Sequence, residues 1–205
     1  MRKNIIVFLF CFLIPFSVDA RPDSLVVNLR FDPNHGVWVR PNNVPAVKIF
    51  FEHIKDTRSN PRSIGVNLER RNDRIPIYSA YNDEVSRFVH STLIREFRRK
   101  NFSVEDQAGT ASKIITTTIL KFWTEETSIY SSQTQLQIEV KDKNGILYLS
   151  RTYTGFGKNK GRSLLDYNYY ECMSDSVASL INKLFSDHDF LSALSASSPP
   201  PGIKK

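Results

Sequence analysis

The chain has 205 residues, 40% of them hydrophobic and 24% charged, which is enough for one domain of ordinary size. Its formal net charge of +7 permits contact with anionic surfaces such as phospholipid head groups or polyanionic glycans. Of its two cysteines, Cys11 lies in a predicted leader, so Cys172 alone remains and the composition excludes an internal disulfide in the mature domain.

The first 20 residues have the pattern of a secretory signal peptide. Arg2 and Lys3 precede an apolar run over residues 5–18, and Val18-Asp19-Ala20 suits a signal peptidase. The run is too short to cross a bilayer core of roughly 30 Å. We therefore expect cleavage after Ala20 and no transmembrane span afterwards, with an uncleaved anchor as the alternative. Two cationic residues and one anionic residue would leave with the leader, which lowers the formal charge from +7 to +6.

The N-terminal half is predicted to supply four strands. Residues 21–44 form a turn-rich lead-in, with a strand at residues 25–29 and Trp38 as an anchor against the core. Alternating apolar side chains predict a second strand at residues 47–51. Residues 64–68 and 75–79 are two further short candidates.

The clearest helix is predicted over residues 82–100, with Asn82 as its N-cap. Its apolar residues recur at helical spacing and form one stripe: Val85, Phe88, Val89, Leu93 and Phe97. Its acidic start and basic end complement the helix dipole. We therefore interpret the basic end as helix stabilisation, with a ligand-facing patch as the alternative; its residues are Arg95, Arg98, Arg99 and Lys100.

The C-terminal half is predicted to form a three-stranded meander and a second helix. Residues 112–156 are rich in side chains that suit a pleated surface, and Asn144-Gly145 favours a tight hairpin because both residues tolerate positive φ. The second helix, over residues 167–186, has Cys172 beside its apolar stripe, so Cys172 is expected to pack and not to react. A short helical turn to Leu194 follows, and residues 196–205 are expected to be a disordered tail.

This order of elements predicts an α+β fold, in which an antiparallel sheet contains the meander and two helices pack on one face. A single domain is expected over residues 45–195. Asp56, Arg58 and Gly65 follow the second strand, and we interpret them as a structural turn, with a ligand site as the alternative. Asp56 would accept backbone hydrogen bonds, Arg58 would pair with it or with a carbonyl, and Gly65 would take a backbone angle that other residues resist.

No residue pattern indicates catalysis, a cofactor or a metal site. The four histidines do not lie at metal-ligand spacing with other histidines, cysteines or carboxylates. Residues 155–161 superficially resemble a phosphate-binding loop but lack the Ser or Thr that should follow the Lys. We interpret this segment as a mobile basic loop, in which Lys158, Lys160 and Arg162 are candidate contacts for an anionic partner.

Three tyrosines lie just before the second helix: Tyr167, Tyr169 and Tyr170. Aromatic clusters bury a large area at a small entropic cost and are typical of partner surfaces. The tyrosines are therefore a candidate partner surface. The alternative is that one or two of them cover the end of the sheet.

The order of elements resembles the YajG-like family of small bacterial envelope lipoproteins over residues 45–195. The resemblance is carried by Asp56-Thr57-Arg58, Ser63-Ile64-Gly65 and Phe102-Ser103-Val104, together with the basic-ended helix, the meander and the last helix. It implies an α+β domain facing the periplasm, with no catalytic residues. The sequence departs from the family at the cleavage site, where there is no lipobox Cys, so a form without a membrane tether is favoured.

These observations predict a non-enzymatic accessory or assembly protein of the bacterial envelope, either periplasmic, secreted or associated with the outer membrane. The expected partner is another envelope protein, contacted through an exposed sheet edge, the basic loop or the tyrosines. One alternative is a binder of an anionic lipid or glycan through the basic loop. A second alternative is an enzyme, which would need a nucleophile and a base such as Cys172 beside a His. Nucleic acid is not expected, because the compartment is wrong and no nucleic-acid module is present.

Overall fold

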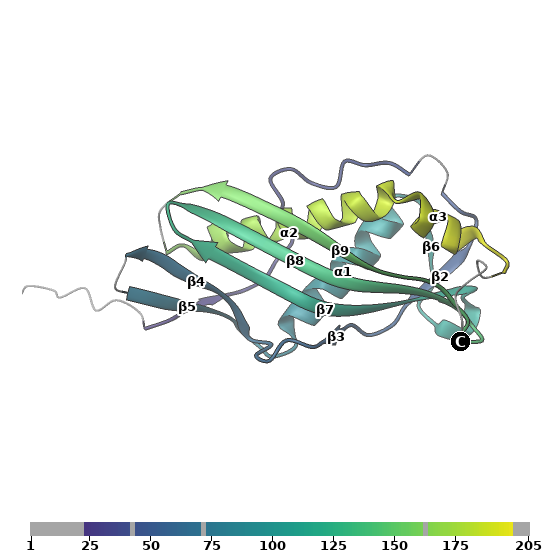
Figure 1. Ribbon diagram of the computed structural model, residues 1–205, viewed down its shortest axis with the longest axis horizontal. Helices are drawn as coiled ribbons and strands as arrows, with labels where there is room; N and C mark the ends of the chain where they lie inside the picture. The colour runs from purple at the N-terminus through teal and green to yellow at the C-terminus, as the bar shows by residue number, and fades with distance from the viewer. Residues whose placement is uncertain (1–22, 42–43, 71–72, 162–163, 199–205) are drawn as a thin grey trace, which may run out of the picture.

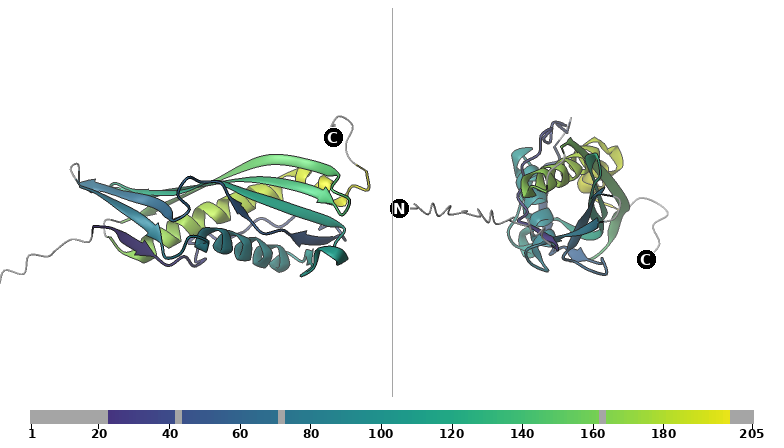
Figure 2. Two further views of the ribbon diagram at one scale, coloured as in Figure 1. Left: turned by 90° about the horizontal axis from the view of Figure 1, so that it is seen from below. Right: turned by 90° about the vertical axis from the view of Figure 1, so that its left-hand side faces the viewer.

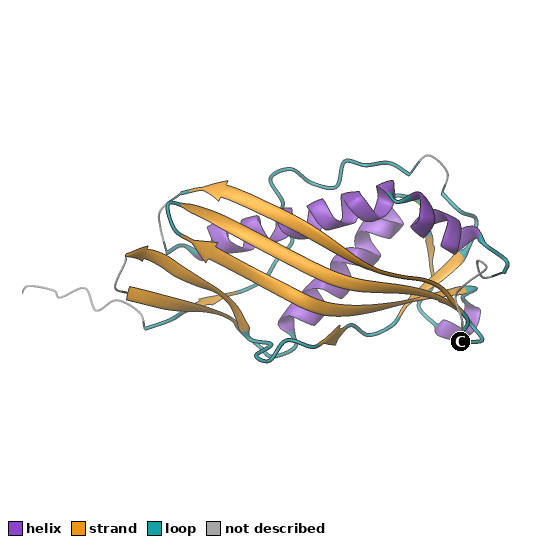
Figure 3. Cartoon of the chain, in the orientation of Figure 1, coloured by secondary structure: helices purple, strands orange, loops and turns teal. Residues whose placement is uncertain are grey.

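The computed structural model describes residues 23–41, 44–70, 73–161 and 164–198. The predicted leader, Arg162 and residues 199–205 of the predicted tail lie outside these ranges. An elongated sheet forms one layer, and the helices lie together on one of its faces (Figures 1 and 2). The α+β class is confirmed (Figure 3).

The longest strands are the three consecutive strands of 14 residues in the C-terminal half. The strands are β1 (Leu25–Val27), β2 (Lys48–Phe51), β3 (Lys55–Asp56), β4 (Ser63–Arg70), β5 (Asp73–Ser79), β6 (Ser103–Val104), β7 (Lys113–Glu126), β8 (Ile129–Asp142) and β9 (Leu147–Lys160). The helices are α1 (Glu84–Arg99), a single turn η1 (Ala108–Thr110), α2 (Asp166–Ser186) and α3 (His188–Ser195).

Strand β7 is the centre of the sheet. On one side β8 pairs with it antiparallel over its whole length, and β9 pairs antiparallel with β8. Along its other side β2, β3 and β4 pair with it in turn, all of them parallel to it. The sheet is therefore mixed and not purely antiparallel as predicted. Apolar alternation indicates which face of a strand is buried, but not which strand lies beside it or in which direction that strand runs.

The turn between β8 and β9 lies where the sequence predicts it, but only one of its two central residues has the predicted backbone. Gly145 has φ +80°, whereas Asn144 is not among the described residues with positive φ. The Asp142 carboxylate instead orders the turn by accepting from the backbone N–H groups of Asn144 at 2.8 Å and Ile146 at 2.9 Å.

The core lies between the sheet and the helices. Every second residue of β8 from Tyr130 to Val140 is buried, and the intervening side chains face outward. The predicted apolar stripe of α1 is buried as well, and Phe97 from this stripe contacts Phe51, Phe102 and Phe185. Burial of apolar surface stabilises the folded state by roughly 25 cal/mol for each Å² that is removed from water.

Helix α2 packs directly on the backbone of β9, because two glycines of that strand carry no side chain. A Cβ atom at Gly155 would lie 1.9 Å from the carbonyl oxygen of Ser176, and one at Gly157 would lie 2.1 Å from that of Cys172. The glycine-rich segment predicted as a mobile loop is therefore the last part of a strand. That prediction was wrong, because the glycines permit close packing of a helix and do not provide loop flexibility.

The lead-in lies along α2 and is held there by the polar side chains of the helix. Ser174 accepts a hydrogen bond from the backbone N–H of Asp32 at 3.1 Å, and Asn182 accepts one from Val39 at 3.0 Å. The predicted anchoring of Trp38 on the core is wrong, since 74% of this residue is exposed. These hydrogen bonds, together with apolar side chains other than Trp38 such as the buried Val37, attach this segment.

Helix α1 starts later than predicted and has a different cap. It begins at Glu84, and Asp83 occupies the N-cap position without a side-chain hydrogen bond. The Glu84 carboxylate accepts instead from the backbone N–H groups of Leu29 at 2.7 Å and Ala80 at 2.6 Å. Asn82 therefore is not the N-cap. The helix start is tied to the lead-in by a carboxylate in its first turn.

The end of α1 is a Schellman motif. Asn101 has φ +66°, the N–H of Asn101 donates to the carbonyl of Arg98, and the N–H of Phe102 donates to that of Phe97. The rings of Phe97 and Phe102 also touch, with centroids 4.8 Å apart. A left-handed residue followed by an apolar contact is the usual composition of this motif.

We expect Asn101→Gly to raise the free energy of unfolding by about 0.5 kcal/mol, because Gly adopts positive φ without strain. Asn101→Val should lower it by about 1–2 kcal/mol, because a β-branched residue resists this conformation. Urea denaturation followed by circular dichroism measures both. Equal stability of the two variants would contradict the role assigned to Asn101.

None of the helices in the described ranges has both the length and the hydropathy of a bilayer-spanning segment.

Candidate functional site

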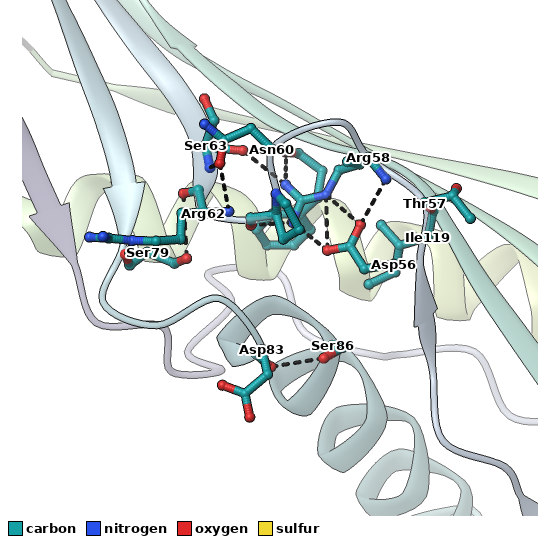
Figure 4. Close-up of polar contacts among 12 residues, drawn as sticks. Asp56, Thr57, Arg58, Asn60, Arg62, Ser63, Ser79, Asp83, Ser86 and Ile119 are labelled. Atoms are coloured by element: carbon teal, nitrogen blue, oxygen red, sulfur yellow. Dashed lines mark hydrogen bonds and ion pairs between the residues drawn. The ribbon is translucent and has the colours of Figure 1, made fainter.

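The charged turn after β3 is a closed network within the fold. Arg58 forms a bidentate ion pair with Asp56, with Nη2 2.6 Å from Oδ2 and Nε 2.9 Å from Oδ1 (Figure 4). Its remaining donors reach the carbonyl oxygens of Pro61, Ser63 and Phe122. Only 10% of each charged side chain is exposed. The arrangement joins the turn to β7 and leaves the guanidinium little capacity for an outside ligand.

Gly65 lies near this turn, but a glycine is required at this position for a different reason from the predicted one. It does not have positive φ. A Cβ atom there would instead lie 2.3 Å from the carbonyl oxygen of Thr124, so the glycine permits β4 to approach β7. The requirement is therefore one of space between strands, which a single sequence cannot distinguish from a requirement of backbone angle.

The three candidate tyrosines do not form one surface. Tyr169 and Tyr170 are buried in the first turns of α2, and Tyr167, with 42% exposed, is the only one of the three that faces solvent to a large extent. The predicted partner surface is therefore wrong for Tyr169 and Tyr170. Their rings belong to the core, where the Tyr170 ring also contacts the guanidinium of Arg30 at 4.2 Å.

A buried polar cluster accounts for Tyr169 and was not predicted. The hydroxyl of Tyr169 donates to the carboxylate of Glu126, and Nδ2 of Asn67 donates to the same carboxylate at 2.5 Å. Burial, together with the bond to Glu126, raises the pKa of Tyr169 far above its ordinary value. Buried polar groups in folded proteins are usually hydrogen-bonded. These hydrogen bonds therefore have a structural role, because they link β4, β7 and α2.

Cys172, the nucleophile considered for an enzyme, is a free thiol inside the core. Burial raises the pKa of Cys172 to about 11. The thiolate is the reactive form, so this environment disfavours nucleophilic chemistry at neutral pH. The described residues also contain no group of three or more His, Cys, Asp or Glu side chains that could hold a metal ion.

A groove of about 750 Å³ lies between β9 and the lead-in, and we call it the β9 groove. One side is formed by Phe156 and Lys158 of β9, the other by Trp38 and its neighbours, and α2 forms the floor. Phe156 is 56% exposed, so two large aromatic side chains line the groove while remaining open to solvent.

Strand β9 is an edge of the sheet. It pairs only with β8 among the described strands, although it is 14 residues long. The carbonyl oxygen of Thr154 accepts from Nζ of Lys183 at 2.6 Å, so at this point a side chain from α2 occupies a group that a neighbouring strand would use. An unpaired edge offers backbone donors and acceptors to an added strand.

The charged side chains around the groove differ in whether they form hydrogen bonds or ion pairs within the protein. Asp175 accepts from the backbone N–H of His35 at 3.1 Å, and Asp187 pairs with Arg151 at 2.6 Å. Burial acts to raise the pKa of Asp187, but hydrogen bonds from Tyr153 and Arg151 outweigh it and lower the pKa. Lys158 and Lys160, by contrast, are exposed and have no ion pair in the part of the chain that the structure describes. The unsatisfied charge at this edge is positive.

Lys158 and Lys160 were predicted to contact an anionic partner. Both lie near the end of β9, and both are exposed. Arg162 lies outside the described residues. The two aromatic residues of the β9 groove were missed, because Trp38 was assigned to the core and Phe156 to a loop. The sequence carries no apolar alternation that could have identified the edge, because the residues of this segment that face the core are the glycines Gly155 and Gly157.

The basic residues at the end of α1 make contacts within the protein. Arg99 pairs with Glu96 at 2.7 Å and also donates to the carbonyl of Val37 at 2.8 Å. Arg98 pairs with Asp106 at 2.6 Å. These contacts attach the lead-in and the segment after β6 to the helix, so most of the basic cluster is engaged within the protein.

Comparison with known proteins finds a shared fold but no sequence family. No protein-family model matches the chain, and no curated protein matches it. A protein from Xanthomonas campestris, described under the family model DUF330, has a TM-score of 0.51 at 10% identity, over 79% of this chain and 90% of that one. The PelC dodecamer of Paraburkholderia phytofirmans has a TM-score of 0.45 at 15% identity, over 78% and 94% of the two chains. Lipoprotein GNA1162 from Neisseria meningitidis has a TM-score of 0.30 at 6% identity, over 69% and 99%.

At such low identity, the likeness to the Xanthomonas campestris protein shows the fold alone. It agrees with the α+β architecture that the resemblance to YajG-like lipoproteins implies. None of these three structures carries the YajG name, so membership of that family stays a prediction.

Proposed function

We propose that this chain is a non-enzymatic accessory protein of the bacterial envelope that binds a partner protein along the free edge of β9. The observation that carries the proposal is the coincidence of three features at one place: a 14-residue edge strand, a groove beside it and two exposed aromatic side chains. The envelope location rests on the predicted signal peptide.

The bound segment would be an extended, acidic stretch of the partner. Backbone groups of β9 would pair with it as an added strand, which is a common way to recognise an extended peptide. Alternate side chains of that segment would then point into the β9 groove, between Trp38 and Phe156. Acidic residues would meet Lys158 and Lys160, whose charges are unsatisfied within the described chain.

The first test is crosslinking in cells. A photoreactive amino acid at position 156 should capture one specific envelope protein. The matched control position is Leu120, which is exposed at 42% on the outer face of β7, away from the groove. Capture of the same abundant proteins from both positions would count against a partner at the β9 edge.

Reversing the charge of the edge should weaken the captured complex. We expect Lys158→Glu/Lys160→Glu to lower affinity for the crosslinked partner by at least about tenfold, because like charges brought together at an interface cost several kcal/mol. The control Lys55→Glu/Lys121→Glu makes the same change in net charge at exposed lysines elsewhere. Isothermal titration with the purified partner measures both variants.

The same variants separate this proposal from the lipid alternative. Vesicles of phosphatidylglycerol are incubated with the wild type and with Lys158→Glu/Lys160→Glu. Salt-sensitive vesicle binding that is lost in this variant, together with no partner from crosslinking, would favour an anionic lipid as the ligand. A partner captured from position 156, with no vesicle binding, supports the protein–protein function.

A further inference from the structure

One side chain interrupts the free edge of β9, the outermost of the three long strands (Figure 1). Lys183 of α2 is exposed, and its Nζ atom donates to the carbonyl oxygen of Thr154 at 2.6 Å. The same atom lies 5.4 Å from the centre of the Phe156 ring. A strand added beside β9 needs the Thr154 carbonyl as an acceptor. Such a strand therefore has to end, or turn away, at Lys183.

Beyond Lys183 the backbone of β9 is open to an added strand. The N–H and C=O groups of one strand residue point to the same side, and this direction repeats at every second residue. The Thr154 carbonyl points away from β8, so the backbone groups of Phe156, Lys158 and Lys160 point away from it as well. The open stretch, residues 155–160, therefore offers pairing positions to about six residues of a partner.

The charge of Lys183 decides which end of a chain can lie beside it. An ammonium group has three donors; Thr154 uses one of them, and Lys183 has no ion pair among the described residues. A carboxylate complements this group, whereas the ammonium at the start of a chain is repelled by it. In an antiparallel arrangement the added strand ends opposite Thr154. The C-terminus of a partner then lies beside Lys183.

The carboxylates that line the β9 groove are engaged elsewhere. Asp187 pairs with Arg151 at 2.6 Å, and Asp175 accepts from the backbone N–H of His35 at 3.1 Å. Two of the three donors of Lys183 are therefore left for an acceptor from outside the described chain.

Trp38 supplies an apolar surface at the same level of the groove. The backbone N–H of the next residue, Val39, donates to Asn182, which precedes Lys183 in α2. Trp38 is 74% exposed and lines the groove opposite β9. The side chain of the last residue of a bound chain can cover this indole ring, which favours an apolar last residue.

We propose that the partner is bound by its C-terminus, an inference that rests on the proposed function. The last residues of the partner pair antiparallel with residues 155–160, and the terminal carboxylate accepts from Nζ of Lys183. The last side chain is apolar and packs on Trp38, and acidic residues before it lie near Lys158 and Lys160. Lys183 is then the specificity-determining residue, because it accepts a chain end and blocks an internal segment.

The test compares free and blocked chain ends. Random peptides of about eight residues, slightly longer than the open stretch, are displayed on phage with a free C-terminus. The same library is also displayed with a fixed Gly-Ser extension after each peptide, and the whole mature chain is the bait. We expect binders from the first library only, with acidic residues before an apolar last residue. A photoreactive amino acid at position 156 of the bait should crosslink to them.

The tightest of these peptides is then synthesised as the free acid and as the C-terminal amide. We expect the amide to bind the wild type at least about tenfold more weakly by fluorescence anisotropy, because it lacks the charged hydrogen bond to Lys183. Lys183→Met should weaken binding of the acid to the level of the amide and leave binding of the amide unchanged. Lys55→Met, at an exposed lysine of β3, should keep the full difference.

The results separate this inference from the proposed function. Peptides that crosslink to position 156 and bind equally well as acid and amide overturn the C-terminal assignment and leave the edge function standing. A difference between acid and amide that persists in Lys183→Met overturns the role of Lys183. If neither library yields a binder that crosslinks to position 156 and is weakened by Lys158→Glu/Lys160→Glu, the proposed function fails and this inference fails with it.

Discussion

Alanine in place of Gly155 or Gly157 is expected to lower the free energy of unfolding by about 3 kcal/mol for each substitution. The added methyl group would overlap backbone atoms of α2, at 1.9 Å from the Ser176 oxygen for Gly155 and 2.1 Å from the Cys172 oxygen for Gly157. A backbone carbonyl inside a helix cannot rotate away, so the whole helix has to move. Overpacking of a core costs about 1–3 kcal/mol, and these contacts are at the severe end of that range.

Thermal unfolding measures this effect. For a chain of this size each kcal/mol corresponds to roughly 2–4 °C, so a decrease in Tm of about 6–12 °C is expected. Gly109→Ala is the matched control, because a Cβ atom there meets no atom within 4 Å and Gly109 does not have positive φ. Equal Tm values for Gly155→Ala and Gly109→Ala would show that α2 does not rest on the backbone of β9.

Arg58→Met is expected to destabilise the protein by a similar amount, about 3 kcal/mol. The substitution leaves the Asp56 carboxylate, with 10% of its side chain exposed, without its cation. It also removes the donors to the carbonyl oxygens of Ser63 and Phe122. Removing one partner of a largely buried ion pair costs more than the pair contributes, because the other charge is left desolvated and unpaired.

Chemical denaturation of a double-mutant cycle separates these contributions. Asp56→Asn, Arg58→Met and the double variant are compared, and the double variant is expected to lose much less than the sum of the single losses. Arg62→Met is the control, because Arg62 is exposed in the same turn and makes one side-chain bond, to Ser79 at 3.3 Å. A small effect of Arg58→Met, within the error of the Arg62→Met value, would contradict the structural role and reopen the turn as a ligand site.

The helices and the long strands could be predicted from local patterns. The first helix was expected over residues 82–100 and is Glu84–Arg99, and the second was expected over 167–186 and is Asp166–Ser186. The short helix after it was also predicted and is His188–Ser195, capped by Asp187. Each of these has an apolar repeat of the appropriate period or a local capping residue, and such signals need no knowledge of the rest of the chain.

The candidate site was predicted much less well. Lys158 and Lys160 were chosen as candidate contacts, but their segment was assigned to a loop, and Phe156 and Trp38 were not chosen at all. Composition alone cannot show whether Gly-rich sequence is a loop or a strand under a closely packed helix, since both need residues without a side chain. For the tyrosines, an aromatic ring suits a core and a binding surface equally well.

Local sequence patterns predict the class of fold, the order of most elements and which face of α1 is buried. The reason is that hydrophobic periodicity acts between residues a few positions apart. Three features could be learned only from the folded chain: β2, β3 and β4 lie parallel to β7, β9 is an edge of the sheet among the described strands, and Lys113 is buried against Tyr148. These features depend on contacts between segments that lie far apart in the chain. The packing of one element determines which partners and how much space another element has.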